Sequence, residues 1–165
     1  MTTRQVFKRK REGKTDYRRR LALLKSGNDR LVIRISGKNI IGQVVRYDEA
    51  GDRVILTVTG ATLAKNGLDV KGNSSLACYL VGLEIAKRAK EKGINELVLD
   101  VGRRRLVKGG RIAAALKGVI EGDCEVPHDP SIFPDDKRIM GSHLKSGGLS
   151  PAKFKEYVKK IGVKN

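Results

Sequence analysis

Basic side chains are concentrated between Phe7 and Arg20, where eight of the fourteen residues are Lys or Arg. Like charges repel one another in a folded monomer, so a block this dense is typical of a segment that a polyanion neutralises. Lys and Arg contact phosphates regardless of base sequence. Phe7 and Tyr17 lie inside the block, and a flat aromatic ring can stack on an unpaired base. The block is therefore predicted to bind nucleic acid, although Tyr17 fits the core stripe of a helix equally well.

The whole chain shares this charge bias. It has 165 residues, a formal net charge of +17 and a pI near 10.2. Residues 1–30 hold eleven basic and three acidic residues, a net of +8, so nearly half of the excess lies in less than a fifth of the chain. A field of this sign attracts polyanions, which favours nucleic acid as the partner and an anionic membrane surface as the second candidate.

Residues that could perform catalysis do not form a recognisable set. Cys124 and His128 are four residues apart and could act as nucleophile and base, but a loop cysteine beside an exposed histidine explains them better. His128 and the nearby Asp129, Asp135 and Asp136 lack a metal-ligand spacing, and acids next to prolines usually cap turns. We expect no cofactor, no metal site and no small-molecule substrate.

An enzyme of one class remains as an alternative. A metal-dependent nuclease on a ribonuclease-like scaffold would use Asp48, Asp100 and Asp123. Asp100 would end a central strand, where α/β enzymes often hold a carboxylate. It stands beside Gly102 and three arginines, so an ion pair or a turn hydrogen bond is the preferred interpretation.

The basic block is predicted to span an extended lead followed by a short helix, within an RNA-binding arm of residues 1–28. Thr15-Asp16 can cap the helix TDYRRRLALLKSG, and Gly27 can end it. Tyr17, Leu21 and Leu24 fall at i, i+4 and i+7, so this stripe is expected to pack while the arginines face outward.

Residues 29–123 are predicted to form an α/β core with a mixed sheet. Three alternating segments joined by short turns, at 30–36, 40–48 and 53–60, predict an antiparallel meander. The polar segment 61–72 is predicted to be irregular. A helix capped by Asn73 or Ser74 and stopped at Gly93 follows, then a strand within 94–102 whose apolar run suggests burial on both faces, then a small-residue helix at 111–122.

Residues 124–165 are predicted to form an irregular arm that ends in a helix. The arm has three prolines and a second basic cluster. Ser150 is the expected N-cap of the last helix, and Phe154, Tyr157, Val158 and Ile161 share one side of it. Two cysteines cannot build a disulfide framework, and no apolar run approaches membrane-spanning length. We therefore expect a cytoplasmic protein without membrane contact.

Three separate motifs resemble one family. GNSSLACYLVGLEIAKRAKEKGINELVLDVG, KRKREGKTDYRRRLALLKSG and GGRIAAALKGVIEGDCEVPHDPSIFPDDKRIMGSHL are similar, in the same order, to the universal large-subunit ribosomal protein that binds 5S ribosomal RNA. It is the eighteenth protein of that subunit in the bacterial count and the fifth in the eukaryotic count. The motifs and the short C-terminus resemble the archaeal type. Arg103-Arg104-Arg105 replaces an often more neutral loop, which leaves the role of that loop open.

The resemblance implies a structural, non-enzymatic role in the large ribosomal subunit. Its partners would be 5S rRNA, the large-subunit rRNA to which 5S rRNA is attached in the central protuberance, and neighbouring ribosomal proteins. Without the resemblance, general RNA binding is the limit of the inference. The positions that would line the RNA are Phe7, Lys8, Arg9, Lys10, Arg11, Lys14, Tyr17, Arg18, Arg19 and Arg20, followed by Asn73, His128, Lys137, Arg138 and His143 as weaker candidates.

Overall fold

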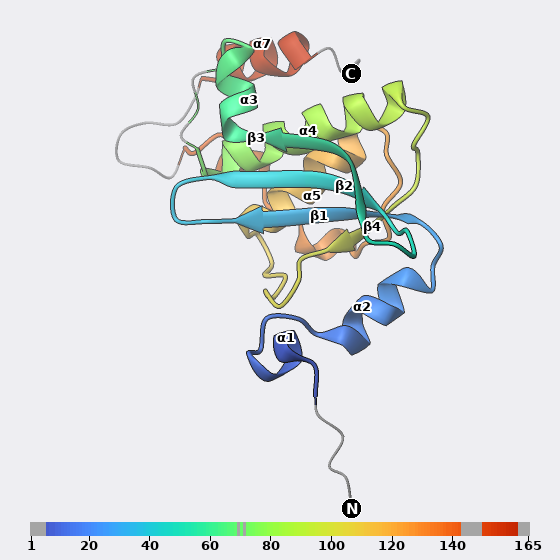
Figure 1. The fold of residues 1–165 in the computed structure, drawn as a ribbon. Helices are drawn as coiled ribbons and strands as arrows, with labels where there is room; N and C mark the ends of the chain where they lie inside the picture. The colour runs from blue at the N-terminus through green and yellow to red at the C-terminus, as the bar shows by residue number, and fades with distance from the viewer. Residues whose placement is uncertain (1–5, 69, 71, 143–149, 162–165) are drawn as a thin grey trace, which may run out of the picture.

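One mixed sheet organises the fold. The computed structural model describes residues 6–68, 70, 72–142 and 150–161, and it has α/β architecture (Figure 1). Strands β1 (Asp29–Ile35), β2 (Ile40–Arg46) and β3 (Arg53–Thr59) form the predicted antiparallel meander. Strand β4 (Leu97–Asp100) pairs in parallel with β1, which makes the order β3-β2-β1-β4. The predicted fold class is confirmed.

Strand β4 departs from the sequence prediction because it lies at an edge of the sheet. Asp100 therefore ends an edge strand and not a central one. Leu97 is buried, but Val98 and Leu99 are only half-buried, so the strand is not fully covered on both faces. An apolar run marks a buried strand in a parallel sheet. Here the same sequence pattern belongs to an edge strand that is only partly covered.

Two helices cover one face of the sheet. Helix α4 (Ser75–Glu91) begins at the predicted Ser74 cap, whose hydroxyl accepts the Ala77 N–H, and the chain turns at Gly93 with φ of 72°. Helix α5 (Arg111–Glu121) packs against α4. A Cβ on Gly82 would lie 2.1 Å from the Ala115 carbonyl oxygen, and one on Gly118 would lie 2.2 Å from the Tyr79 carbonyl oxygen. Glycine is needed at both positions because the two backbones touch.

A helix that the sequence did not predict follows β3. Helix α3 (Gly60–Lys65) occupies part of the segment predicted to be irregular. Thr59 and Thr62 form a reciprocal capping box at its start. Leu63 and Leu68 are fully buried, and they contribute to the core cluster. The segment is polar in composition, but two leucines and a cap are enough to order it.

The C-terminal segment packs on the same core. It contains the short 3-10 helix η1 (Pro130–Ile132), helix α6 (Asp136–Ile139) and helix α7 (Pro151–Ile161). The Ser150 hydroxyl accepts the Lys153 N–H at the start of α7, as expected for the predicted N-cap. Side chains from each part of this segment join the buried cluster of the sheet and α4, namely Cys124, Val126, Ile139, Val158 and Ile161.

The N-terminal arm and α7 lie at opposite ends of the molecule (Figure 1). Helix α2 (Tyr17–Leu24) is capped by the Asp16 carboxylate, which accepts the N–H groups of Arg18 and Arg19. The predicted extended lead is wrong, because Lys8–Arg11 form one helical turn, α1. The predicted packing stripe is wrong for two of its three residues: Leu21 is 57% exposed and Tyr17 is 37% exposed, while Leu24 is half-buried. The helix is attached through its arginines, which leaves Tyr17 and Leu21 uncovered.

Candidate nucleic-acid interface

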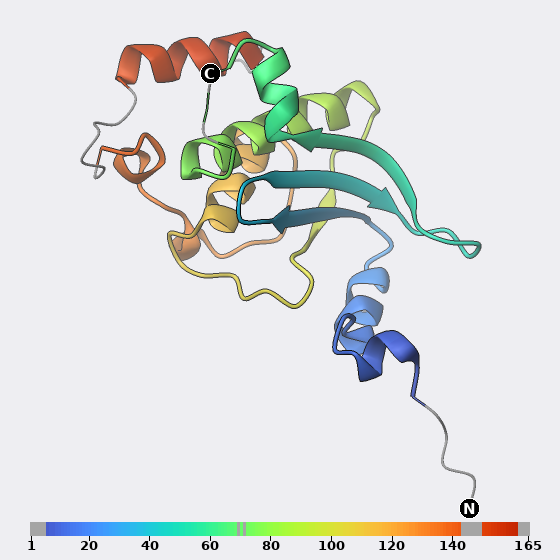
Figure 2. The same ribbon diagram turned by 60° about the vertical axis from the view of Figure 1, so that its left-hand side comes forward.

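The second face of the sheet is turned toward the arm. Side chains alternate along a strand, so Leu31, Ile33 and Ile35 enter the core while the alternate residues of β1 face the other way. Figure 2 shows the arm and the β2–β3 hairpin extending from the side of the sheet away from α7. We call this second face the open face. Its residues in the cavity described below are Arg30, Val32, Arg34, Gln43, Val45, Val54 and Asp100.

The arm is held near the open face by contacts between segments far apart in the chain. Arg20 Nη2 on α2 lies 2.8 Å from Asp52 Oδ2 in the β2–β3 hairpin. Arg19 Nη1 donates to the Gly102 carbonyl at 3.1 Å. In the opposite direction, Arg103 donates to the Gly13 carbonyl. Three contacts therefore tie the arm to the hairpin and to the loop after β4.

A buried arginine links these contacts to the sheet. Arg30 is 3% exposed, with Nη1 3.1 Å from Asp100 Oδ2 and Nη2 2.6 Å from Asp52 Oδ2. The Asp52 contact is an ion pair without hydrogen-bond alignment, and Arg30 Nε has no acceptor among the described residues. Asp52 thus serves Arg20 and Arg30 together. A buried charge requires such partners, because removal from water is costly.

Asp100 is the second anchor of this network. Its Oδ1 accepts the Gly102 N–H at 2.7 Å and lies 3.2 Å from Arg34 Nη2. Burial alone would raise the pKa of the Asp100 carboxyl. The Gly102 N–H and the cations of Arg34 and Arg30 outweigh burial, so the pKa of Asp100 is lowered and the carboxylate stays ionised. The preferred sequence interpretation of Asp100, an ion pair and a turn hydrogen bond, is confirmed.

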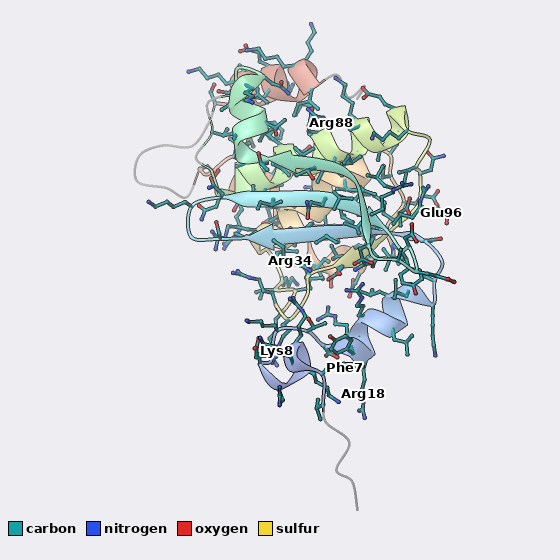
Figure 3. All side chains as sticks on the ribbon, viewed as in Figure 1. Phe7, Lys8, Arg18, Arg34, Arg88 and Glu96 are labelled. Carbon is teal, nitrogen blue, oxygen red and sulfur yellow. The ribbon has the colours of Figure 1, made fainter. Side chains whose placement is uncertain are left out.

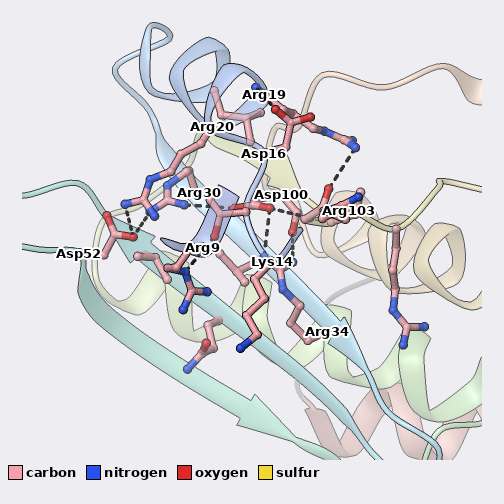
Figure 4. A pocket seen from close by; sticks show the side chains of 18 of the residues that line it. Arg9, Lys14, Asp16, Arg19, Arg20, Arg30, Arg34, Asp52, Asp100 and Arg103 are labelled. Carbon is pink, nitrogen blue, oxygen red and sulfur yellow. Dashed lines mark hydrogen bonds and ion pairs between the residues drawn. The ribbon is translucent and has the colours of Figure 1, made fainter. Parts of the chain in front are cut away.

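A cavity of about 440 Å³ separates the arm from the open face (Figure 4). Val32, Val45 and Val54 contribute apolar surface from the sheet. Eight basic and three acidic residues line the cavity, so its lining carries an excess of five positive charges. The basic ones are Arg9, Lys14, Arg19, Arg20, Arg30, Arg34, Arg103 and Arg104, and the acidic ones are Asp16, Asp52 and Asp100.

The outer side of the arm presents cations and aromatic rings to solvent. The rings of Phe7 and Tyr17 form a tilted pair with 5.5 Å between centroids and 43° between planes, and Phe7 is 73% exposed (Figure 3). Lys10, Arg11 and Arg18 are exposed, and the described residues include no acidic partner within 4.0 Å of them. Lys8 and Lys14 reach Glu12, and Arg9 donates to Thr15. Exposed pairs of this kind contribute little and exchange readily for phosphate.

The weaker sequence candidates do not join the arm. The Asn73 amide donates to the carbonyls of Ser36 and Gly37, so it fastens the β1–β2 turn. His128 is exposed and its Nδ1 is 2.7 Å from the Val126 carbonyl. Lys137 and Arg138 lie on α6, and Arg138 Nε donates to the Gly109 carbonyl. His143 lies outside the described residues.

The candidates for chemistry each contact other groups of the fold. Cys124 is buried with its thiol near the carbonyls of Ala86 and Ile94, and burial raises its pKa. Asp123 pairs with Lys90, while Asp100 is held by arginines. Within the described ranges, no three His, Cys, Asp or Glu side chains gather in a way that would hold a metal ion. None of the helices in the described part of the chain combines the length and apolarity needed to cross a bilayer.

Four basic residues that line the cavity were not among the predicted RNA-binding residues, namely Arg30, Arg34, Arg103 and Arg104. The alternation in RLVIRIS already places Arg30 and Arg34 on the face opposite the core. Parallel pairing of β1 with β4 then brings Asp100 and the loop after it beside them. That pairing joins segments about seventy residues apart, so local sequence patterns do not predict it.

The fold and the candidate interface together define a basic protein with an α/β core and an arm that presents cations to solvent. Residues 3–96 match the model of the family described as "Ribosomal large subunit proteins 60S L5, and 50S L18". The chain belongs to this family. It is therefore a structural constituent of the large ribosomal subunit and not an enzyme.

The sequence is similar to curated relatives over most of the length of both chains. The large ribosomal subunit protein uL18 of Thermoplasma acidophilum is 52% identical over 93% of this chain and 92% of its own. The uL18 proteins of Thermoplasma volcanium and Korarchaeum cryptofilum are 48% and 46% identical, over 93% and 85% of this chain and 94% and 72% of their own. The expected archaeal type is confirmed.

Proposed function

We propose that this chain binds 5S rRNA and helps to attach it to the large-subunit rRNA in the central protuberance, beside neighbouring ribosomal proteins. The arm is the principal adhesive element, and the open face is the surface over which the RNA passes. The observation that carries this proposal is the exposed set on the arm: Lys10, Arg11 and Arg18 without acidic partners among the described residues, next to the tilted ring pair of Phe7 and Tyr17.

The chemistry of this set suits folded RNA with unpaired bases. Exposed cations neutralise phosphates and release counterions, which makes affinity strongly dependent on salt. Exposed aromatic rings stack on splayed bases, which a continuous duplex does not offer. The deep major groove of A-form RNA is closed to side chains, so discrimination rests on the shape of the RNA and on its loops.

Six to ten phosphate contacts are expected for an arm of this charge. Such an interface loses on the order of a thousandfold or more in affinity between 50 and 200 mM salt. The fold prepares part of the arm in advance, because α2 is already capped by Asp16 and tied to Asp52 and Gly102. Preformed contacts reduce the ordering cost of binding.

The test measures binding of the full chain to isolated 5S rRNA over a range of salt concentrations. Replacing Lys10, Arg11 and Arg18 together by Gln is expected to weaken binding at least tenfold and to reduce the slope of log K against log salt by about 2 to 3. The matched control replaces Lys153, Lys155 and Lys159 by Gln. These are exposed lysines on α7, at the opposite end of the molecule (Figure 1).

A structured RNA of equal length serves as the competitor. The proposal requires tighter binding to 5S rRNA than to this competitor at moderate salt. Equal affinity for the two RNAs would overturn the assignment of 5S rRNA. Equal losses in the arm variant and the α7 variant would show that net charge, and not the arm, drives binding.

A further inference from the structure

The cavity between the arm and the open face is unusual for a purely electrostatic surface. Basic surfaces that only follow an RNA backbone need exposed cations and no enclosed apolar space. Here one valine from each of β1, β2 and β3 lines the cavity. Arginines from the arm, from β1 and from the loop after β4 line it as well (Figure 4). Val54 is half exposed, so this apolar surface can be reached from solvent.

We infer that this cavity receives one unpaired nucleotide of the bound RNA, with its base against the valines and its phosphate among the arginines. The inference rests on the proposed RNA-binding function and adds a single-nucleotide site to it. The volume of about 440 Å³ falls within the 300–1,000 Å³ range of small-ligand pockets and admits one nucleotide, not a base pair.

The apolar surface favours a base over a bare phosphate. Val32 and Val45 are nearly buried, and Val54 completes a strip across neighbouring strands. An apolar strip offers no hydrogen bond to an anion but accepts the flat face of any base. Gln43 lines the same cavity, and its Nε2 donates to Thr57 Oγ1 at 3.1 Å. The Gln43 carbonyl oxygen is directed to no donor among the described residues, so it is available to the exocyclic amino group of a base.

The cationic side of the cavity is held in position before RNA arrives. Arg34 Nη1 donates to the carbonyls of Ile33 and Asp100, and Nη2 lies by the Asp100 carboxylate. Arg34 remains 43% exposed, so its guanidinium is fixed and accessible at once. Arg19 and Arg103 are likewise fixed through backbone carbonyls. Guanidinium groups oriented in this way suit a phosphate, because planar forks bind its oxygens in pairs.

The two carboxylates orient the arginines without cancelling them. Asp52 and Asp100 are each engaged by two arginines, so neither presents an unpaired charge to the cavity. The lining keeps its excess of five positive charges after these pairs are counted. The cavity therefore offers positive charge to the phosphate of a nucleotide and apolar surface to its base.

A charge-neutral block tests the inference. Val54→Trp would fill the cavity from its rim, while Ile41→Trp places the same ring on the open face at a residue that does not line the cavity. Val54 and Ile41 are 50% and 40% exposed, so both positions tolerate the larger ring without repacking the core. We expect Val54→Trp to weaken binding of 5S rRNA about 5- to 150-fold, the range for loss of one stacked base, and to reduce the slope of log K against log salt by no more than about 1, for the one phosphate that the cavity holds. Ile41→Trp should stay within about twofold of the unaltered protein.

A second measurement uses the unaltered protein and a small probe. Adenosine 5′-monophosphate is titrated into isotopically labelled protein, and the methyl signals of Val32, Val45 and Val54 are followed by NMR. Saturable shifts of these signals, absent with inorganic phosphate at the same concentration and ionic strength, are expected. Equal shifts with phosphate would reduce the cavity to an anion site and overturn the inference, as would the absence of any shift with the nucleotide.

The outcomes separate this inference from the proposed function. If both tryptophan variants bind 5S rRNA as tightly as the unaltered protein, the nucleotide site is wrong and RNA binding by the arm still stands. If the unaltered protein does not prefer 5S rRNA, the proposed function falls, whatever the nucleotide titration shows. Loss of binding in both tryptophan variants would indicate general blockage of the open face and would overturn the cavity as the site.

Discussion

Replacement of Asp100 by Asn should destabilise the fold through a single buried arginine. Arg30 is 3% exposed and has two carboxylate partners, Asp100 at 3.1 Å and Asp52 at 2.6 Å. Asn keeps the volume of the side chain and can still accept the Gly102 N–H. The substitution therefore removes charge from the network and little else.

The magnitude follows from what remains after the change. Breaking a buried ion pair by removing one partner costs about 3–5 kcal/mol, because the other charge is left uncompensated. Asp52 stays beside Arg30, so the low end of this range applies. Loss of the Arg34 contact adds little, since Arg34 is 43% exposed and exposed pairs contribute about 0–1 kcal/mol. We expect a loss of about 3 kcal/mol in the free energy of unfolding.

Urea denaturation followed by circular dichroism measures this loss. Glu156→Gln, which breaks the exposed pair with Lys160 on α7, is the control and should cost about 0.5 kcal/mol or less. The pKa of Asp100 is lowered in the folded protein, so its contribution is present above the unfolded pKa near 4 and disappears as pH falls through the folded pKa. The difference between Asp100→Asn and the unaltered protein should accordingly narrow below about pH 4. A cost no larger than that of the control at pH 7 would refute the account of Arg30.

Two further predictions concern the helical layer. Gly82→Ala should lower the free energy of unfolding by about 1–3 kcal/mol in thermal or urea unfolding, because its Cβ would lie 2.1 Å from the Ala115 carbonyl oxygen. The control is Gly37→Ala, whose Cβ would have nothing within 4 Å and which should change stability by no more than about 0.5 kcal/mol. Equal effects of the two substitutions would contradict the close approach of α4 and α5. Burial raises the pKa of the Cys78 thiol to about 12, against an opposing effect of Arg111, and burial also raises the pKa of the Cys124 thiol. Iodoacetamide at pH 8 should therefore modify neither cysteine until denaturant is added. Rapid labelling of the folded protein, detected by mass spectrometry, would contradict their burial.

The elements that depend on local patterns were predictable from sequence. Alternation in the three strands, the Ser74 and Ser150 caps and the Gly93 stop all act within a few residues, and each is found where it was expected. Helix α3 was missed because its capping box uses two threonines where Glu or Gln is the usual second member. Helix α1 was missed because four consecutive cations oppose helix formation, and no apolar pattern marks the turn.

The candidate site was predictable only in its exposed part. A dense basic block with two aromatic residues is visible in composition alone, and in the structure it forms α1, α2 and the exposed outer side of the arm. The cavity depends on Asp52 and Asp100, which meet Arg30 only because β4 pairs with β1 and the β2–β3 hairpin bends toward α2. The Tyr17–Leu21–Leu24 periodicity predicted burial, but polar attachment of α2 through Arg19 and Arg20 leaves Tyr17 and Leu21 exposed and Leu24 half-buried.

The hydrogen bond from Arg103 to the Gly13 carbonyl has a consequence for folding during synthesis. The two residues are 90 positions apart, so at roughly 5–20 residues per second the arm waits on the order of 5 to 20 s for its anchor to be synthesised. During that time β1 also lacks β4, its parallel neighbour. A highly cationic segment thus leaves the exit tunnel of a translating ribosome, an RNA-rich surface, before the platform that orients it exists. Correct assembly requires that early, unspecific contacts of the nascent arm be weak enough to dissolve once the sheet closes.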